Sequence, residues 1–242
     1  MLIPFGRLPI SDVGGIIHVG AHEAEELSDY VSFGKTKVLW VEANPDKWSC
    51  ISEKISDYPG MRLGRFAAAS STGGSATLNI ASNGQSSSLL PFGTHANSYP
   101  SIVYTEKVSV DLCSVDDWIF RLGVDPAGYN FVNLDIQGYE LQALRGMTSQ
   151  LRYVDYVYTE VNFRDVYAGC AKMVELDDFL AGFGLRRVAV VDTGAGWGDA
   201  FYSRKSHYGL QVALCVEIVA AFPKKLGRLG KRILKRLFQW SR

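Results

Sequence analysis

Runs of apolar and β-branched residues alternate with stretches of helical periodicity along most of the chain. The apolar runs predict strands over residues 14–21, 37–43, 61–70, 74–81, 107–113, 130–136, 154–161, 185–194 and 198–205. The helical stretches cover residues 23–34, 44–60, 114–123, 139–147 and 172–184. Such alternation predicts an α/β fold, a mostly parallel sheet with helices on both faces. The last two strands are joined by the tight turn DTGAGWGD, which predicts an antiparallel hairpin at one edge.

The charge is unevenly distributed along the chain, although the formal net charge is zero. Residues 223–242 hold eight Lys and Arg and no acid, which leaves 17 basic against 25 acidic residues elsewhere. A domain that binds nucleic acid normally carries its positive charge on the folded surface, so we expect no nucleic-acid partner. A length of 242 residues suits one domain. We therefore expect an N-terminal extension over 1–13, one domain over 14–222 and a basic tail over 223–242.

Cysteine usage and hydropathy predict a cytoplasmic protein. The cysteines lie 45 or more residues apart, so neither a zinc motif nor a disulfide framework is indicated. Residues 1–12 lack the apolar core of a signal peptide. No run reaches the roughly 18 apolar residues of a membrane span.

A glycine lies where the first predicted strand, IIHV, passes into the first predicted helix. Gly20 would let a ligand approach the backbone, but the second and third glycines of a G-x-G-x-x-G dinucleotide motif are absent. Glu23, Glu25 and Glu26 follow in what the pattern predicts as the first helical turn, where they would repel a diphosphate. They are compatible with a cationic ligand such as S-adenosylmethionine (SAM), although Glu25 and Glu26 also fit a solvated helix face.

Three acids follow predicted buried strands. Glu42 ends the second strand, VLWVE, where a carboxylate can accept two hydrogen bonds from a ribose diol. Asp135 ends NFVNLD, the fourth strand of the alternation, which should lie beside the first strand at the point where the strand order reverses. There it could orient a substrate hydroxyl or take its proton. Glu160, in VYTEVN, should face the same edge. The alternatives are helix-capping or structural hydrogen bonds.

Five separated segments carry a resemblance to a known family. IIHVGAHEAEE, LWVEANP, AAAS, NLDIQGYELQALRGM and YTEVN occur in the order and spacing of the FkbM family of SAM-dependent methyltransferases, over roughly residues 14–205. The resemblance implies a Rossmann-like class I methyltransferase fold with a seven-stranded sheet. It also implies SAM as cofactor and O-methylation of a hydroxyl on a sugar, glycan or secondary metabolite. His18, His22 and Ala24 replace the usual Asp, Asn and last Gly of the first motif, and Gln137 replaces a Glu of the later one.

The resemblance and the residues together define the predicted site. The predicted catalytic residues are Asp135, Glu160 and His22. The predicted cofactor-binding residues are His18, Gly20, Ala21, His22, Glu42, Ala43, Asn44, Ala68, Ser87 and Asp135. His18 and His22 form H-x-x-x-H, but on a strand and a turn, so zinc is not expected. Two rival functions stay open: a non-catalytic SAM-binding or scaffold protein, and an enzyme of NAD or nucleotide sugars.

Three further segments have two interpretations each. Residues 82–105, which include Gln85 and three serines at 86–88, form a long loop that either closes over the cofactor or is a flexible linker. Trp197 and Tyr202 are interpreted as core or oligomer contacts, with a substrate platform as the alternative.

Residues 223–242 have the pattern of a basic amphipathic helix, which predicts that they bind an anionic membrane surface at the inner face of the membrane. The alternative is a solubilising end or docking on a partner. The sequence leaves open whether the protein uses a divalent metal and whether it forms a homo-oligomer.

Overall fold

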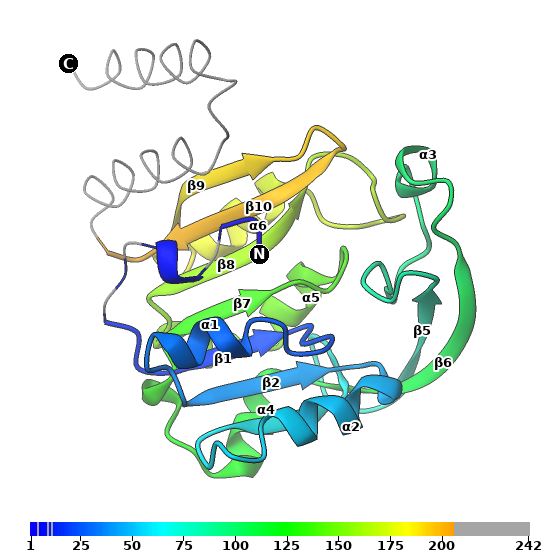
Figure 1. The fold of residues 1–242 in the computed structure, drawn as a ribbon. Coiled ribbons are helices and arrows are strands. Elements are labelled where there is room, and N and C mark those ends of the chain that lie inside the picture. Colours follow the sequence, from blue (N-terminus) through cyan, green and yellow to red (C-terminus); the bar gives the residue numbers. More distant parts are fainter. Residues whose placement is uncertain (4, 9, 11, 206–242) are drawn as a thin grey trace, which may run out of the picture.

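The structure is a computed structural model that describes residues 1–3, 5–8, 10 and 12–205 (Figure 1). The predicted basic tail, residues 223–242, and the end of the predicted domain, residues 206–222, lie outside the described residues. None of the helices in the described part is long and apolar enough to cross a membrane.

Seven strands form the central sheet in the order β3-β2-β1-β7-β8-β10-β9. They are β1 Ile16–Val19, β2 Val38–Glu42, β3 Arg62–Arg65, β7 Phe131–Leu134, β8 Tyr156–Asn162, β9 Arg186–Asp192 and β10 Trp197–Ser203. β1 pairs in parallel with β2 on one side and β7 on the other, and β7 pairs in parallel with β8. β10 runs antiparallel to both β8 and β9. The predicted parallel sheet and antiparallel hairpin are confirmed. In this hairpin β9 is the edge strand, and β10 lies between β9 and β8.

A second, three-stranded sheet stands at the carboxyl end of the central strands (Figure 1). It consists of β4 Ala67–Ala68, β6 Tyr104–Cys113 and β5 Ser75–Ala81, with β6 in the middle. β5 and β6 form an antiparallel ladder, so the predicted strand over 74–81 is confirmed. The loop between them therefore lies over the edge at which the central strands end.

Helices and 3-10 turns cover the central sheet, except α3, which lies in the segment between β5 and β6 (Figure 1). The helices are α1 Leu27–Ser32, α2 Pro45–Lys54, α3 His95–Ser98, α4 Val115–Leu122, α5 Glu140–Arg145 and α6 Met173–Ala181, and the 3-10 turns are Phe5–Arg7, Pro126–Gly128 and Gln150–Arg152. Local signals fix their ends: the Ser114 side chain accepts from the N–H of Asp117 at the start of α4, and Gly123 ends it in a left-handed conformation.

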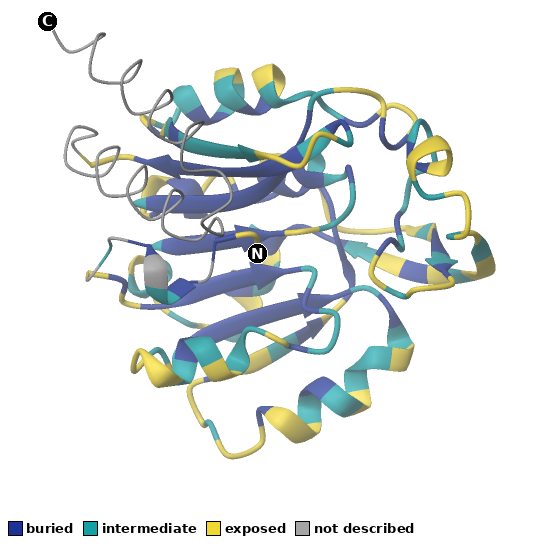
Figure 2. Ribbon diagram, turned by 45° about the horizontal axis from the view of Figure 1, so that its top comes forward, coloured by how far each residue is buried: buried dark blue, intermediate teal, exposed yellow. Residues whose placement is uncertain are grey.

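Alternate residues of the strands in the middle of the sheet enter two apolar cores, one on each face. Figure 2 shows that these strands are buried along most of their length. Ile17 and Val132 pack with α4, α5 and α6, whereas Ile16 and Phe131 pack with residues of α1 and α2. Helices on both faces are thereby confirmed. The second core also contains four apolar residues from the region predicted as an extension, which are Ile3, Phe5, Leu8 and Val13.

The first helix begins later than the sequence predicts. α1 starts at Leu27, with Glu26 at its N-cap, instead of at residue 23. His22 and Ala24 both adopt positive φ, 45° and 54°, which a helix cannot contain. Glu23 and Glu25 therefore lie in a strand-to-helix turn and not in a helical first turn. Ala24 stands where the family pattern usually has glycine, the residue that adopts positive φ most readily.

Candidate active site

The turn that follows β1 packs directly against the backbone at the end of β7. Gly20 follows β1 with φ of 89°, and a Cβ at this position would collide with the carbonyl oxygen of Asp135. Only glycine accommodates both the backbone angle and the close approach. The backbone N–H groups of Gly20 and Ala21 donate to the carbonyl oxygen of Val41, which ties the same turn to β2.

Glu42 ends β2 as a buried carboxyl that holds two backbone segments. Its Oε2 accepts from the N–H of His22 at 2.7 Å, and its Oε1 accepts from the N–H of Asn44 at 2.7 Å. Burial raises the pKa of Glu42, while these hydrogen bonds act in the opposite direction. Each carboxylate oxygen retains acceptor capacity, because it can take more than one hydrogen bond.

A small cavity of about 70 Å³ lies against Glu42. Its lining includes the predicted cofactor residues Gly20, His22, Glu42, Ala43, Asn44, Ala68, Ser87 and Asp135. The predicted residue Ala21 is buried and is not among them. The side chain of Asn44 already accepts from the N–H of Asp46 as the cap of α2, and the Ser87 hydroxyl donates to the Gly84 carbonyl at 2.6 Å.

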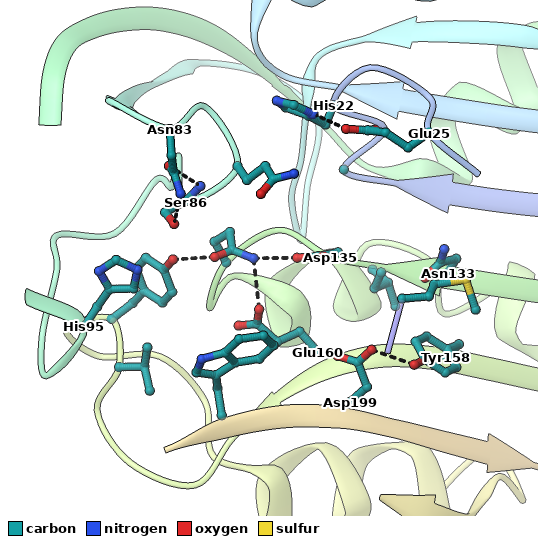
Figure 3. Close-up of a pocket in the computed structure, with 18 of the residues that line it drawn as sticks. His22, Glu25, Asn83, Ser86, His95, Asn133, Asp135, Tyr158, Glu160 and Asp199 are labelled. Carbon is teal, nitrogen blue, oxygen red and sulfur yellow. Dashed lines mark hydrogen bonds and ion pairs between the residues drawn. The ribbon is translucent and has the colours of Figure 1, made fainter. Parts of the chain in front are cut away.

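A larger cavity of about 430 Å³ continues from the small one (Figure 3). Both cavities are lined by Gly20, His22, Gln85, Asp135 and Gln137. A volume in this range fits a small-molecule ligand. The two cavities thus form one site at the carboxyl ends of β1, β2, β7 and β8, where the strand order reverses.

Gln137 links the predicted catalytic carboxyls. Its Nε2 donates to Asp135 Oδ1 at 2.5 Å and to Glu160 Oε2 at 2.9 Å, and its Oε1 accepts from the Tyr167 hydroxyl (Figure 3). Gln137 has φ of 55°, and its carbonyl accepts from the Ser88 hydroxyl at 2.7 Å. A glutamine here can donate to two carboxylates at once, which a glutamate could not do.

The protein environment favours the neutral form of several carboxyls. Asp135 opens onto the cavity, where the surrounding protein and the nearby Asp199 raise its pKa. Burial raises the pKa of Glu160 well above its usual range, and the neighbouring Asp135 adds to this. Glu160 Oε1 is buried with no hydrogen-bond partner among the described residues. Glu140 is different: burial raises its pKa to about 7, and its Oε1 accepts from the N–H groups of Ile136 and Gly138, so it holds the turn after β7.

The two histidines of the first motif occupy different environments. His18 is buried in the sheet, stacked on Trp40, and its Nδ1 lies 3.0 Å from the Tyr30 hydroxyl. Burial lowers the pKa of His18, so its ring is neutral at pH 7. His22 Nδ1 lies 2.6 Å from Glu25 Oε1, and this contact raises the pKa of His22. Figure 3 places His22 across the cavity from Glu160, apart from the other two predicted catalytic residues.

The long loop is docked on the site. Gly93 and Thr94 donate their N–H groups to the carbonyls of Val166 and Asp165, and Ser88 forms an isolated bridge with Asn79. Gln85 and Ser86 line the larger cavity, and Ser88 lines the smaller one. These contacts do not fit a flexible linker, and closure of the loop over the cofactor stays a prediction.

Asp199 and His95 line the larger cavity, although no sequence signal singled them out. Asp199 lies opposite Glu160 in the β8–β10 ladder and accepts from the Tyr158 hydroxyl at 2.5 Å. His95 comes from α3, and Trp197 begins β10 and lines the cavity, whereas Tyr202 is buried in the core. Tyr202 is thus a core residue, whereas Trp197 packs against the cluster of Val166, Tyr167 and Cys170 and also lines the cavity. A substrate platform at Trp197 stays a prediction. Only the insertion of β10 beside β8 brings Asp199 and Trp197 to the site, and the antiparallel partner of β8 was not predicted.

No group of three or more His, Cys, Asp or Glu in the part of the chain that the structure describes is arranged to hold a metal ion.

A family model, the methyltransferase FkbM domain, matches residues 18–187. This match includes the site residues His18, Asp135 and Glu160. The chain belongs to the FkbM methyltransferase family. The predicted family and fold are thereby confirmed.

Two curated FkbM-type relatives match part of the chain. The hexuronic acid methyltransferase AglP of Haloferax volcanii is 26% identical over 151 residues, 62% of this chain and 54% of the relative. The 2-O-methyltransferase NoeI of Sinorhizobium fredii is 25% identical over 91 residues, 38% of this chain and 37% of the relative. The chain thus spans about half the length of the first relative and less of the second. Among solved structures, a SAM-dependent methyltransferase from Aquifex aeolicus aligns over 81% of this chain and 85% of its own, with 12% identity and a TM-score of 0.43.

Proposed function

We propose that this chain transfers a methyl group from SAM to a hydroxyl oxygen of a sugar, glycan or secondary metabolite. Membership of the FkbM family supports the methyl donor, and both relatives are named as methyltransferases, one of them of a hexuronic acid. The observation that carries the proposal is the position of Glu42 and Asp135 on either side of Gly20, at the ends of β2 and β7.

The residues at the rim fit SAM better than a diphosphate. Glu42 would hold the ribose through its remaining acceptor capacity, and the glycine turn would let the ligand approach the backbone. The acids Glu25 and Glu26 line the larger cavity, where they favour a ligand with ammonium and sulfonium groups over a phosphate. Asn133 Oδ1 lies buried at this cavity without a partner among the described residues, as an acceptor for an N–H donor would.

The chain's own residues would position the acceptor and move one proton. When bound, SAM supplies an activated methyl group on a sulfonium. Asp135 faces the cavity and would accept the proton of the acceptor hydroxyl, while Gln137 fixes its Oδ1. Glu160, whose neutral form is favoured by burial, would donate or accept a hydrogen bond at its free Oε1. Most of the rate gain would come from holding the two reacting atoms in line.

Calorimetry tests the cofactor and excludes the two rivals in turn. The product S-adenosylhomocysteine (SAH) and SAM should both bind, and NAD should not. Binding of NAD in preference to SAH would favour the nucleotide enzyme. Methyl-labelled SAM, incubated with glycans from the source organism, should then yield labelled glycan. Binding of SAH with no label in any glycan fraction would favour the scaffold.

The basic tail and the location stay predictions. Residues 223–242 carry eight Lys and Arg with apolar residues at helical spacing, which supports binding to an anionic membrane surface. Deletion of these residues should abolish sedimentation with vesicles rich in phosphatidylserine and spare SAH binding. Unchanged sedimentation would contradict the membrane role.

A further inference from the structure

The far end of the larger cavity is built from aromatic side chains. Trp197, Tyr167, His95 and Tyr99 line the larger cavity, and the His95 ring lies against those of Tyr99 and Tyr167. Figure 3 places His95 at the opposite end of the cavity from Asn133 and Tyr158. None of these four was used above to hold SAM. The aromatic end is also separate from Glu42, which lines only the small cavity.

The aromatic side chains are held in fixed positions. The His95 ring stacks on Phe92 with centroids 4.3 Å apart, and Phe92 stacks on Tyr104 at 3.8 Å. The Tyr167 hydroxyl donates to Gln137, and Tyr167 is almost fully buried. A rigid aromatic wall of this kind suits a ligand with an apolar face, because the negative face of an aromatic ring attracts polarised C–H groups.

Two buried polar atoms at this end lack partners among the described residues. They are Glu160 Oε1 and His95 Nδ1, and both residues are at least 95% buried with side chains that line the cavity. Buried polar atoms in folded proteins are nearly always paired, so each of these points to a group supplied by a ligand. A hydroxyl can donate to either atom and accept from a protonated carboxyl.

The charge of the cavity limits what the ligand can be. Five carboxyl side chains line it, from Glu25, Glu26, Asp135, Glu160 and Asp199, and no Lys or Arg of the described residues does. The amino group of Met1, which also lines the cavity, lies 3.5 Å from Glu26 Oε1 and is attracted by Asp199 and Asp135. A uronate carboxylate would have to leave water at a place where no Arg or Lys of the described residues could pair with it, which is costly whether or not the neighbouring carboxyls are ionised.

We propose, on the basis of the function proposed above, that Trp197, His95 and Glu160 form the acceptor subsite, and that it takes an uncharged sugar ring and rejects a uronic acid. The C–H face of the ring lies on the aromatic wall, and its hydroxyls pair with Glu160 Oε1 and His95 Nδ1. One hydroxyl faces Asp135. Its oxygen forms the new bond to the methyl carbon of SAM as the carbon–sulfur bond breaks, its proton passes to Asp135, and SAH leaves. The acceptor would thus differ from the hexuronic acid for which the relative AglP is named.

Matched acceptor pairs test this inference on the full chain. Methyl glucoside and methyl glucuronoside, and the corresponding galactose and mannose pairs, differ only at C6. The uncharged member should be methylated with a kcat/KM about tenfold or more higher, which corresponds to about 1.4 kcal/mol. Preference for a uronoside, equal use of both members, or use of neither member of any pair by protein that binds SAH would overturn the subsite. Failure to bind SAH would instead overturn the proposed function.

Variants of the aromatic wall separate a binding role from a structural one. Trp197→Ala should raise the KM for the uncharged sugar roughly tenfold and leave the Kd for SAH unchanged, and Trp197→Tyr should restore the KM. Tyr153→Ala, at an exposed aromatic outside the cavity, is the control and should change neither constant. Tyr99→Arg should shift the kcat/KM ratio toward the uronoside. An unchanged KM in Trp197→Ala, or an unchanged ratio in Tyr99→Arg, would contradict the subsite.

Discussion

The Glu42 carboxylate at the end of β2 accepts a 2.7 Å hydrogen bond from the backbone N–H of His22, in the turn after β1. One side chain therefore sets the shape of the glycine turn on the neighbouring strand. In our proposal the same carboxylate also binds the ribose of SAM, so the cofactor site and the turn depend on each other.

Replacing Glu42 should affect both cofactor binding and folding. Glu42→Ala should weaken SAH binding by about 1–3 kcal/mol through lost hydrogen bonds to a charged group. It should also lower the free energy of unfolding, because the N–H groups of His22 and Asn44 lose their acceptor. Calorimetry and urea unfolding measure the two effects. Glu53→Ala, at an exposed position of α2, is the control and should change neither. Full SAH affinity in folded Glu42→Ala would remove Glu42 from the site.

The close contact at Gly20 predicts a large loss of stability on adding one methyl group. Gly20→Ala combines a strained positive φ with a collision against the Asp135 carbonyl, so it should cost about 2–5 kcal/mol. Gly34 also has positive φ, 70°, but its missing Cβ would meet nothing within 4 Å. Gly34→Ala should therefore cost only about 1–2 kcal/mol. Equal losses in the two variants on urea unfolding would mean that β1 and β7 are not in close contact there.

Asp135 should govern turnover and its pH dependence. Asp135→Asn should lower kcat by roughly 10²–10⁴-fold, the range for loss of a general base, and leave SAH binding nearly unchanged. Because its environment raises the pKa of Asp135, kcat of the wild type should fall as pH drops, beginning above the usual range of an aspartate. The residual activity of the variant should lack this fall. An unchanged kcat would exclude Asp135 from proton transfer.

Glu140 should make folding less favourable as pH rises. Its pKa is raised from 4.5 to about 7 in the folded chain, so the unfolded chain loses this proton first. The free energy of unfolding should fall between about pH 4.5 and pH 7, by on the order of 3 kcal/mol from this group, and level off above. Glu140→Gln keeps the acceptor for Ile136 and Gly138 and should show a smaller fall. Identical pH profiles in urea unfolding would show that Glu140 ionises freely in the folded state.

The strands of the site could be predicted because their signals are local. IIHVG, VLWVE and NFVNLD each combine an apolar run with a terminal glycine or acid, and parallel topology then places their ends together. This reasoning put Gly20, Glu42 and Asp135 at one edge of the sheet. The start of α1 was predicted wrongly because the backbone angles at His22 and Ala24 depend on tertiary contacts. One of these is the hydrogen bond from the His22 N–H to Glu42, which lies 20 residues away.

The acceptor end of the site had no comparable signal. His95 and Trp197 come from a loop and from an inserted antiparallel strand, and their positions depend on tertiary contacts with residues 165–167 and with β8. Trp197 is a large apolar residue of the kind that usually lies in a core. It lines the cavity because β10 lies beside β8. The sequence of a strand does not show whether an aromatic residue at its end lies in a core or at a cavity, because this depends on which strands are its neighbours.

The most direct test of the central claim is a crystal structure of the full chain with SAH. We predict that SAH lies across the glycine turn, with both ribose hydroxyls within hydrogen-bond distance of the Glu42 carboxylate and its sulfur facing the cavity lined by Asp135. Electron density for SAH at any other place, with the space between Gly20 and Glu42 empty, would contradict the account.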